Sequence, residues 1–143
     1  MKILSVDPGE KRIGIAITDP DGTIALPMEI INHISRELDA KKIARLAEEN
    51  QVGLLIFGIA LDTGGNLTPS ARKSQRLADA VREFTSINIE MVDEYGSTNV
   101  VQQAAVEMGL NRKQRRSHRD DIAALVILQN YLETHRSENI GDS

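Results

Sequence analysis

The chain has 143 residues, the size of one ordinary domain, and 41% of them are hydrophobic. It contains no cysteine, which excludes disulfides, thiolate zinc sites and cysteine nucleophiles. The net charge of −4 argues against a protein that coats nucleic acid non-specifically, because affinity for phosphate comes from lysine and arginine. The longest uninterrupted apolar run, Ile122 to Leu128, is too short to span a membrane, and the N-terminus has no signal-peptide pattern. A cytoplasmic location is therefore expected.

The first part of the chain predicts three strands joined by short turns. Residues 12–18 alternate, with isoleucines on one face and Gly14, Ala16 and Thr18 on the other. The small face indicates that another element packs close to it. Pro27 inside the third segment favours an edge strand or a break. The predicted strands are residues 2–6, 12–18 and 23–31, with turns at 7–11 and 19–22.

Helical and strand patterns alternate over the rest of the chain. Ser35 is a candidate N-cap for a helix that ends near Asn50. Its inward-facing positions are predicted to be Leu38, Ile43, Leu46 and Ala47. Residues 52–57 are almost entirely apolar, which predicts a strand buried on both faces. The remaining predicted elements are helices over 70–84, 97–108 and 119–132, a strand over 87–92, and a polar, disordered tail over 134–143. The inward positions of the helix over 70–84 are predicted to be Ala71, Ser74, Leu77, Ala78 and Val81.

An antiparallel meander followed by βα units and a closing helix predicts an α/β fold. We expect a mixed five-stranded sheet with helices on both faces. No linker, repeat or low-complexity segment interrupts the pattern, so residues 1–133 are predicted to form one domain.

Acidic residues fall at the ends of three predicted elements. Asp7 follows the first strand, Asp93-Glu94 follows the fifth, and Asp120-Asp121 lies in the first turn of the last helix. Ligands of open α/β sheets bind beyond the carboxyl ends of the strands, and a central first strand would allow the fifth strand to be its neighbour. Oxygen-only carboxylate clusters bind Mg²⁺ or Mn²⁺, and two such ions about 4 Å apart support phosphodiester cleavage. The pattern favours a metal-dependent nuclease.

Each acid also has a simpler interpretation when it is taken alone. Asp7 precedes a Pro-Gly pair and fits turn chemistry, and Asp93 fits a solvated strand end. Ser117 and Asp120 match a capping box, and acids in a first helical turn suit the helix dipole. Asp121 lies about 100° further round the helix, so one acid of that pair is expected to be solvated or capping. Only the metal site explains all three positions together.

A basic run lies directly before the last acidic position. Its members are Arg112, Lys113, Arg115, Arg116 and Arg119. An isolated run of this kind is usually a solvated loop, but its place before a carboxylate-bearing helix favours phosphate contact. Lys11 and Arg12 follow Asp7 and fit a solvated hairpin turn as well as they fit substrate contact.

Four segments carry a resemblance to a known family. They read DPGEKRIGIAITD at 7–19, GIALDTGG at 58–65, DEYGST at 93–98 and DDIAALVILQNYL at 120–132. In order and spacing they resemble the motifs of the YqgF family, Holliday-junction-resolvase-like proteins also described as pre-16S ribosomal RNA nucleases. The resemblance covers residues 1 to 133 and implies a ribonuclease H-like fold.

The resemblance also implies the site. Asp7, Glu94 and Asp120 would be the catalytic, metal-binding acids, with Mg²⁺ or Mn²⁺ as the cofactor. The register selects Asp120 over Asp121, in line with sheet-facing positions at Ala124, Ile127 and Tyr131. The residues expected to contact nucleic acid are Lys11, Arg12, Arg115, Arg116 and Arg119.

The expected activity is hydrolysis of phosphodiester bonds during maturation of the 5′ end of pre-16S ribosomal RNA. The expected partners are nucleic acid, as structured RNA or branched DNA, and the ribosome or a pre-ribosomal particle. No membrane association is expected, and the chain would act as a monomer or a homodimer.

The chain departs from the family pattern at three positions. Tyr95 stands where the family usually has Arg, Ala60 where it has Pro, and Asp62 where it has Asn. The missing Arg leaves open a non-catalytic nucleic-acid- or ribosome-binding module. A resolvase for branched DNA is a further alternative, which a two-fold dimer would favour. An ATPase of the sugar-kinase and actin type has a similar opening hairpin, but it needs two such domains and this chain has room for one.

Overall fold

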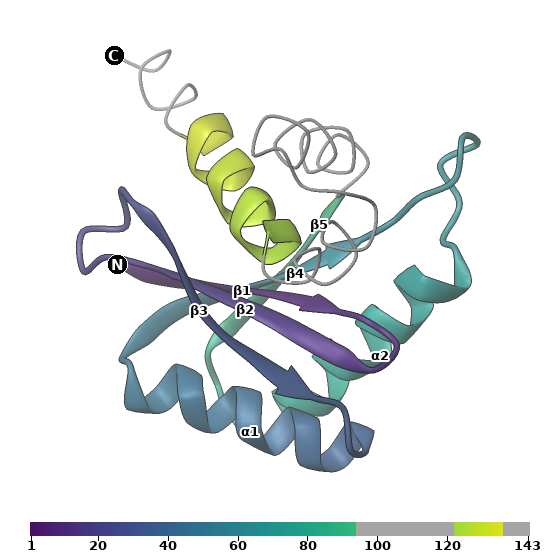
Figure 1. The fold of residues 1–143 in the computed structure, drawn as a ribbon, viewed down its shortest axis with the longest axis horizontal. Coiled ribbons are helices and arrows are strands. Elements are labelled where there is room, and N and C mark those ends of the chain that lie inside the picture. Colours follow the sequence, from purple (N-terminus) through teal and green to yellow (C-terminus); the bar gives the residue numbers. More distant parts are fainter. Residues whose placement is uncertain (94–121, 136–143) are drawn as a thin grey trace, which may run out of the picture.

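The computed structural model describes residues 1–93 and 122–135 (Figure 1). A five-stranded mixed sheet with strand order β3-β2-β1-β4-β5 forms its centre. The strands are β1 (Lys2–Pro8), β2 (Arg12–Thr18), β3 (Ala25–Asn32), β4 (Val52–Ile59) and β5 (Asn88–Asp93). The helices are α1 (Arg36–Glu49), α2 (Pro69–Arg82) and a helix over residues 122–135, which is called the C-terminal helix below.

β1 is the central strand, but β5 is not its neighbour. β2 pairs antiparallel with β1 and with β3, whereas β4 pairs parallel with β1 and β5 pairs parallel with β4. The first and fifth strands, which the sequence allowed to be neighbours if the first were central, are therefore separated by β4. β4 is the first strand to return after a helix and takes the free edge of β1, which leaves β5 to add beyond β4.

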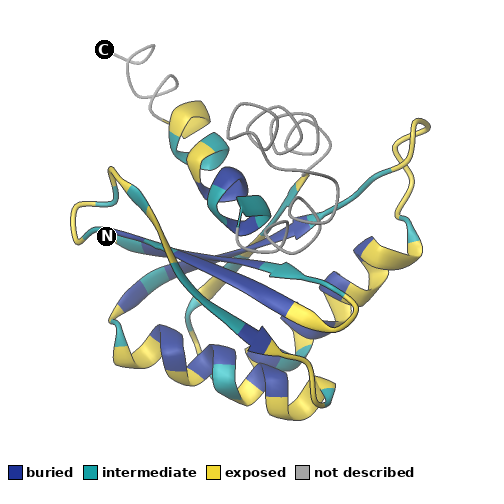
Figure 2. Cartoon of the chain, viewed as in Figure 1, coloured by how far each residue is buried: buried dark blue, intermediate teal, exposed yellow. Residues whose placement is uncertain are grey.

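Helices cover both faces of the sheet, which confirms the predicted layers. In Figure 1, α1 and α2 lie below the sheet and the C-terminal helix lies above it. The lower core contains Val6, Ile15 and Phe57 from the strands, and the upper core contains Ile3, Ala16 and Ile56. Figure 2 shows the buried residues concentrated in β1, β2 and β4, between the two layers. Alternate residues of each central strand therefore belong to opposite cores.

The two labelled helices begin at capping residues. The Ser35 hydroxyl accepts a hydrogen bond from the Leu38 N–H (3.2 Å), and the Thr68 hydroxyl accepts one from the Ala71 N–H (3.1 Å). The five inward positions predicted for α2 are all buried. In α1, Leu38 is 50% exposed, so its predicted inward position is wrong. Five residues separate it from the buried Ile43, which puts it about 140° away around the helix.

Two strands are longer than predicted, and one of them carries the first candidate acid. β1 continues through Pro8, and Asp7 pairs with Gly14 of β2. Asp7 therefore belongs to the sheet, not to a turn. β4 likewise runs two residues past its predicted end. β3 is an edge strand, as Pro27 predicted, and the β2–β3 register shifts between Ile15 and Ala16.

The C-terminal helix runs through residue 135, two residues into the predicted tail. The remainder of that tail, the predicted helix over 97–108 and the basic run lie outside the described residues. Within the described ranges, no helix is long and apolar enough to cross a membrane.

Candidate active site

Asp7 lies at the carboxyl end of the central strand. It is half-buried, and its neighbours in β1 show which face of the sheet it belongs to. Ile3 packs in the upper core and the Ser5 hydroxyl contacts the C-terminal helix, so alternation places Asp7 on that same face. The carboxylate thus belongs to the C-terminal helix side of the sheet.

Glycines flank Asp7 on both neighbouring strands. Gly14 is its cross-strand partner in β2, and Gly58 follows Phe57, the partner of Val6 in β4. Alternation puts both glycines on the face that Asp7 occupies, since Ala16 and Ile56 belong to the upper core. Directly opposed side chains in a sheet have Cβ atoms about 5 Å apart. Neither neighbour therefore places a side chain beside the Asp7 carboxylate.

A buried hydrogen bond joins the C-terminal helix to β1 beside this position. The Ser5 hydroxyl donates to the Ala124 carbonyl oxygen at 2.7 Å. Further along the helix, the Tyr131 hydroxyl donates to Glu90 Oε2 of β5 at 3.0 Å. Ala124 and Ile127 are buried and Tyr131 packs against the upper core, which confirms the sheet-facing register predicted for this helix.

Asp93 is the last residue of β5, and the alternation of that strand shows which face it belongs to. Glu90 contacts Tyr131 and Val92 packs in the upper core, whereas Ile89 and Met91 pack in the lower core. Asp93 has the parity of Ile89 and Met91, so it is an exposed residue on the face opposite Asp7. The predicted catalytic acids Glu94 and Asp120 lie outside the described residues.

The hairpin after Asp7 carries two of the predicted basic residues. Lys11 and Arg12 are exposed at the edge of the sheet where β1 ends. The hairpin is held by hydrogen bonds from Gly9 N–H to the Arg12 carbonyl oxygen and from His33 N–H to the Lys11 carbonyl oxygen, both 2.8 Å. Neither side chain forms an ion pair with any described carboxylate. Arg115, Arg116 and Arg119 lie outside the described residues.

The loop after β4 explains one departure from the family pattern. Asp62 Oδ1 accepts hydrogen bonds from the Gly64 and Asn66 N–H groups, both at 2.9 Å. The Asp62 N–H in turn donates to the Asn66 carbonyl oxygen at 2.9 Å. Asp62 thus closes its own loop, a role that a side-chain amide oxygen of Asn would also fill.

The described residues contain one part of the expected metal site. Among them, no three His, Asp or Glu side chains form a group that could hold a metal ion. Asp7 is the one predicted ligand among them. Its carboxylate, with glycines on both sides, has the oxygen donors that Mg²⁺ and Mn²⁺ prefer.

The sequence patterns did not predict the partner of His33. This histidine lies in the loop between β3 and α1, and its Nδ1 pairs with Oδ2 of the buried Asp39. A polar residue in the inward stripe of α1 was the available signal, because a buried carboxylate requires a partner.

A family model described as "RuvX: Holliday junction resolvase" matches residues 1–134. Two of the similar curated proteins are named "Putative pre-16S rRNA nuclease". The protein from Thermoanaerobacter pseudethanolicus is 34% identical over 96% of this chain and 100% of its own length. The protein from Roseiflexus sp. is 33% identical over 94% of this chain and 96% of its own length.

Solved structures share the fold at low sequence identity. RuvC from T. thermophilus, in complex with a Holliday junction substrate, superposes with a TM-score of 0.58 at 12% identity, covering 94% of this chain and 96% of its own. The Fowlpox virus resolvase, bound to Holliday junction DNA, gives a TM-score of 0.52 at 16% identity, covering 94% and 98%. The expected ribonuclease H-like fold is confirmed.

Proposed function

Because the chain belongs to the RuvX family, we propose that it is a nuclease that hydrolyses phosphodiester bonds with Mg²⁺ or Mn²⁺. We further propose that its substrate is structured RNA, in 5′-end maturation of pre-16S ribosomal RNA in the cytoplasm. The named relatives support the substrate. The position of Asp7 at the end of the central strand, between Gly14 and Gly58, supports the chemistry.

We assign Asp7, Glu94 and Asp120 as the residues that hold the metal. Glu90 and Val92 of β5 belong to the face that Asp7 occupies, and Glu94 is the next residue of that period-two series. Asp120 precedes the sheet-facing Ala124 by four residues, which is about one helical turn. The bound metal would activate the attacking water and stabilise the leaving oxygen.

The other residues of the proposed site hold the C-terminal helix in place or bind the substrate. The Ser5–Ala124 hydrogen bond fixes the C-terminal helix over β1, two residues before Asp7 on the same face. Lys11 and Arg12 at the adjacent hairpin, together with Arg115, Arg116 and Arg119, would bind the phosphates of the strand. Such a cluster of positive charge would offset the net charge of −4 where the substrate binds.

The family description gives a second candidate substrate, branched DNA.

One cleavage experiment tests both substrates. A labelled precursor ribosomal RNA 5′ end and a four-way DNA junction are incubated with Mn²⁺ and the wild-type chain or Asp7→Asn. Asp93→Asn is the matched control, because it removes the same charge from the end of β5, on the face opposite Asp7. We expect RNA cleavage that Asp7→Asn abolishes and Asp93→Asn retains.

Each other outcome changes the assignment. Junction cleavage without RNA cleavage would make the chain a resolvase. Cleavage that survives in Asp7→Asn protein of wild-type stability would overturn the carboxylate–metal site. Binding that needs no metal, with no cleavage by the wild type, would identify a non-catalytic module.

A further inference from the structure

A pocket of about 230 Å³ lies where β1 ends, on the lower face of the sheet. Asp7 belongs to the upper face, so the pocket and the proposed metal site share one sheet edge but not one side of it. The proposed cleavage site uses none of the residues that line the pocket. The residues that matter here are Pro8, Gly9, His33, Arg36, Asp39 and Lys73.

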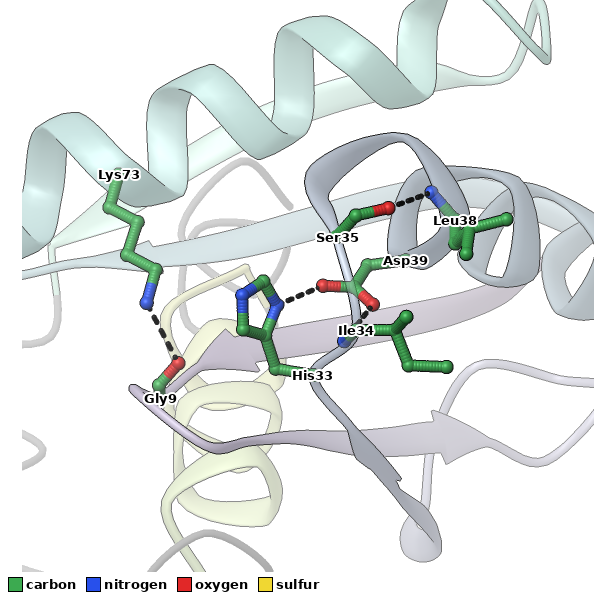
Figure 3. A network of polar contacts seen from close by, with 7 residues as sticks. All are labelled: Gly9, His33, Ile34, Ser35, Leu38, Asp39 and Lys73. Carbon is green, nitrogen blue, oxygen red and sulfur yellow. Dashed lines mark hydrogen bonds and ion pairs between the residues drawn. The ribbon is translucent and has the colours of Figure 1, made fainter.

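The one carboxylate in this pocket is already engaged on both oxygens. Asp39 is 3% exposed, its Oδ1 accepts a hydrogen bond from the Ile34 N–H at 3.1 Å, and its Oδ2 pairs with His33 Nδ1. This pairing holds the His33 imidazole in place. The second ring nitrogen, Nε2, lies on the side of Lys73 (Figure 3). Asp39 therefore orients His33 and offers no free acceptor to a cation.

Two cationic side chains complete the lining. Lys73 reaches across from α2, and its Nζ donates to the Gly9 carbonyl oxygen at 3.3 Å (Figure 3). Arg36 lies in the first turn of α1. Within the described ranges, neither Lys73 nor Arg36 forms an ion pair, whereas Lys41, Lys42, Arg45 and Arg82 each pair with a carboxylate. The pocket thus carries positive charge that the described acids do not balance.

We propose that this pocket binds a phosphate group. Arg36 and Lys73 supply charge-assisted donors, and the ring of His33 lines the pocket beside them. The volume is below the roughly 300–1,000 Å³ of pockets for drug-sized ligands, so it suits a single small anion. A phosphate of a nucleic-acid strand and free inorganic phosphate present the same chemistry.

The position of the pocket favours a phosphate of a nucleic-acid strand over free inorganic phosphate. Pro8 and Gly9 follow Asp7 directly. A nucleic-acid strand bound at Asp7 would therefore pass the rim of the pocket. In this form the inference rests on the proposed function, because it takes the strand to be the substrate.

The test compares two double variants of equal charge. Arg36→Gln/Lys73→Gln removes the pocket cations, and Arg45→Gln/Arg76→Gln removes two exposed cations of the same helices outside the pocket. Binding of a short single-stranded RNA is measured without divalent metal, as a function of salt. We expect the pocket variant to bind about tenfold more weakly than the control variant at low salt. Its salt slope should fall by about 0.7, the value for one lost phosphate contact on a single strand.

Inorganic phosphate gives the second arm. Its titration is followed by NMR at the Gly9 amide and the His33 ring, with a saturable shift expected in the wild type and the control variant but not in the pocket variant. A shift without any difference in RNA binding would assign the pocket to free phosphate. Equal behaviour of the two variants in both arms would overturn the inference.

The two proposals can fail separately. These measurements contain no metal and no cleavage step, so they hold whether or not the chain is a nuclease. If the wild-type chain cleaves neither substrate, the proposed nuclease function is wrong, but the phosphate site is unaffected. Thermal unfolding of both variants checks that the exposed substitutions leave the fold intact.

Discussion

The hydroxyl of Ser5 donates a 2.7 Å hydrogen bond to the carbonyl oxygen of Ala124, across 119 positions of sequence. Both residues are fully buried, and the bond joins the central strand to the helix that covers the upper face. Asp7 lies two residues further along the same face of β1. This contact therefore joins the C-terminal helix to the strand that carries the candidate acid.

Ser5→Ala should lower the free energy of unfolding by about 0.5–1.5 kcal/mol, because a buried hydrogen bond is lost while the helix carbonyl keeps its helical partner. Urea denaturation followed by circular dichroism measures the change. Ser70→Ala, at an exposed position in the first turn of α2, is the control and should stay within about 0.5 kcal/mol of the wild type. Equal midpoints for Ser5→Ala and the wild type would show that the contact contributes nothing.

Ala16→Leu should reduce cleavage more than stability alone explains. Ala16 is fully buried in the upper core, and added volume there pushes against the C-terminal helix at a cost of about 1–3 kcal/mol. Ile17→Val is the control on the opposite face of the same strand, with an expected cost of about 0.5–1.5 kcal/mol. Cleavage rates of folded protein, measured well below both unfolding midpoints, should fall for Ala16→Leu and stay unchanged for Ile17→Val. Equal cleavage rates for Ala16→Leu and Ile17→Val would show that the position of the C-terminal helix does not affect activity.

His33→Ala should destabilise the chain by about 1–3 kcal/mol, because it leaves the buried Asp39 carboxylate without one of its partners. The neighbouring Ile34 is 71% exposed, so Ile34→Ala is the matched control and should change stability by less than about 0.5 kcal/mol. Guanidinium unfolding of the three proteins compares them. If His33→Ala and Ile34→Ala unfold at the same guanidinium concentration, the His33–Asp39 pair contributes nothing to stability.

Asp19 should make stability depend on pH in the acid range. Hydrogen bonds from the Thr23 and Ile24 N–H groups hold the pKa of its carboxyl below the ordinary value of 3.8. A group whose folded pKa is lowered contributes stability above its unfolded pKa, and that contribution disappears as the pH falls through the folded pKa. The stability difference between the wild type and Asp19→Asn should therefore shrink below about pH 4.

Unfolding free energies measured from pH 6 to pH 2 test this prediction for Asp19. Asp21→Asn lies in the same turn and changes the net charge equally, but it leaves these hydrogen bonds in place. Parallel curves for the wild type and Asp19→Asn over the whole range would contradict the assignment.

Local patterns in the sequence determined much of the fold. The isoleucines of β2 and the five inward residues of α2 were placed correctly, because side-chain direction follows from the period of a strand or a helix. Ser35 marked the start of α1, because an N-cap bonds a residue three positions away. Pro27 marked an edge strand, because it cannot donate to a neighbouring strand.

Contacts between distant segments were decided only by the tertiary structure. The sequence singled out Asp7, but the pairing with Gly14 showed that it lies within the strand and on which face. The insertion of β4 between β1 and β5, and the His33–Asp39 pair, likewise depend on segments that meet only in the folded chain. Periodicity records which side of an element is buried, whereas strand order and polar partners depend on which elements pack together, and no local pattern contains that information.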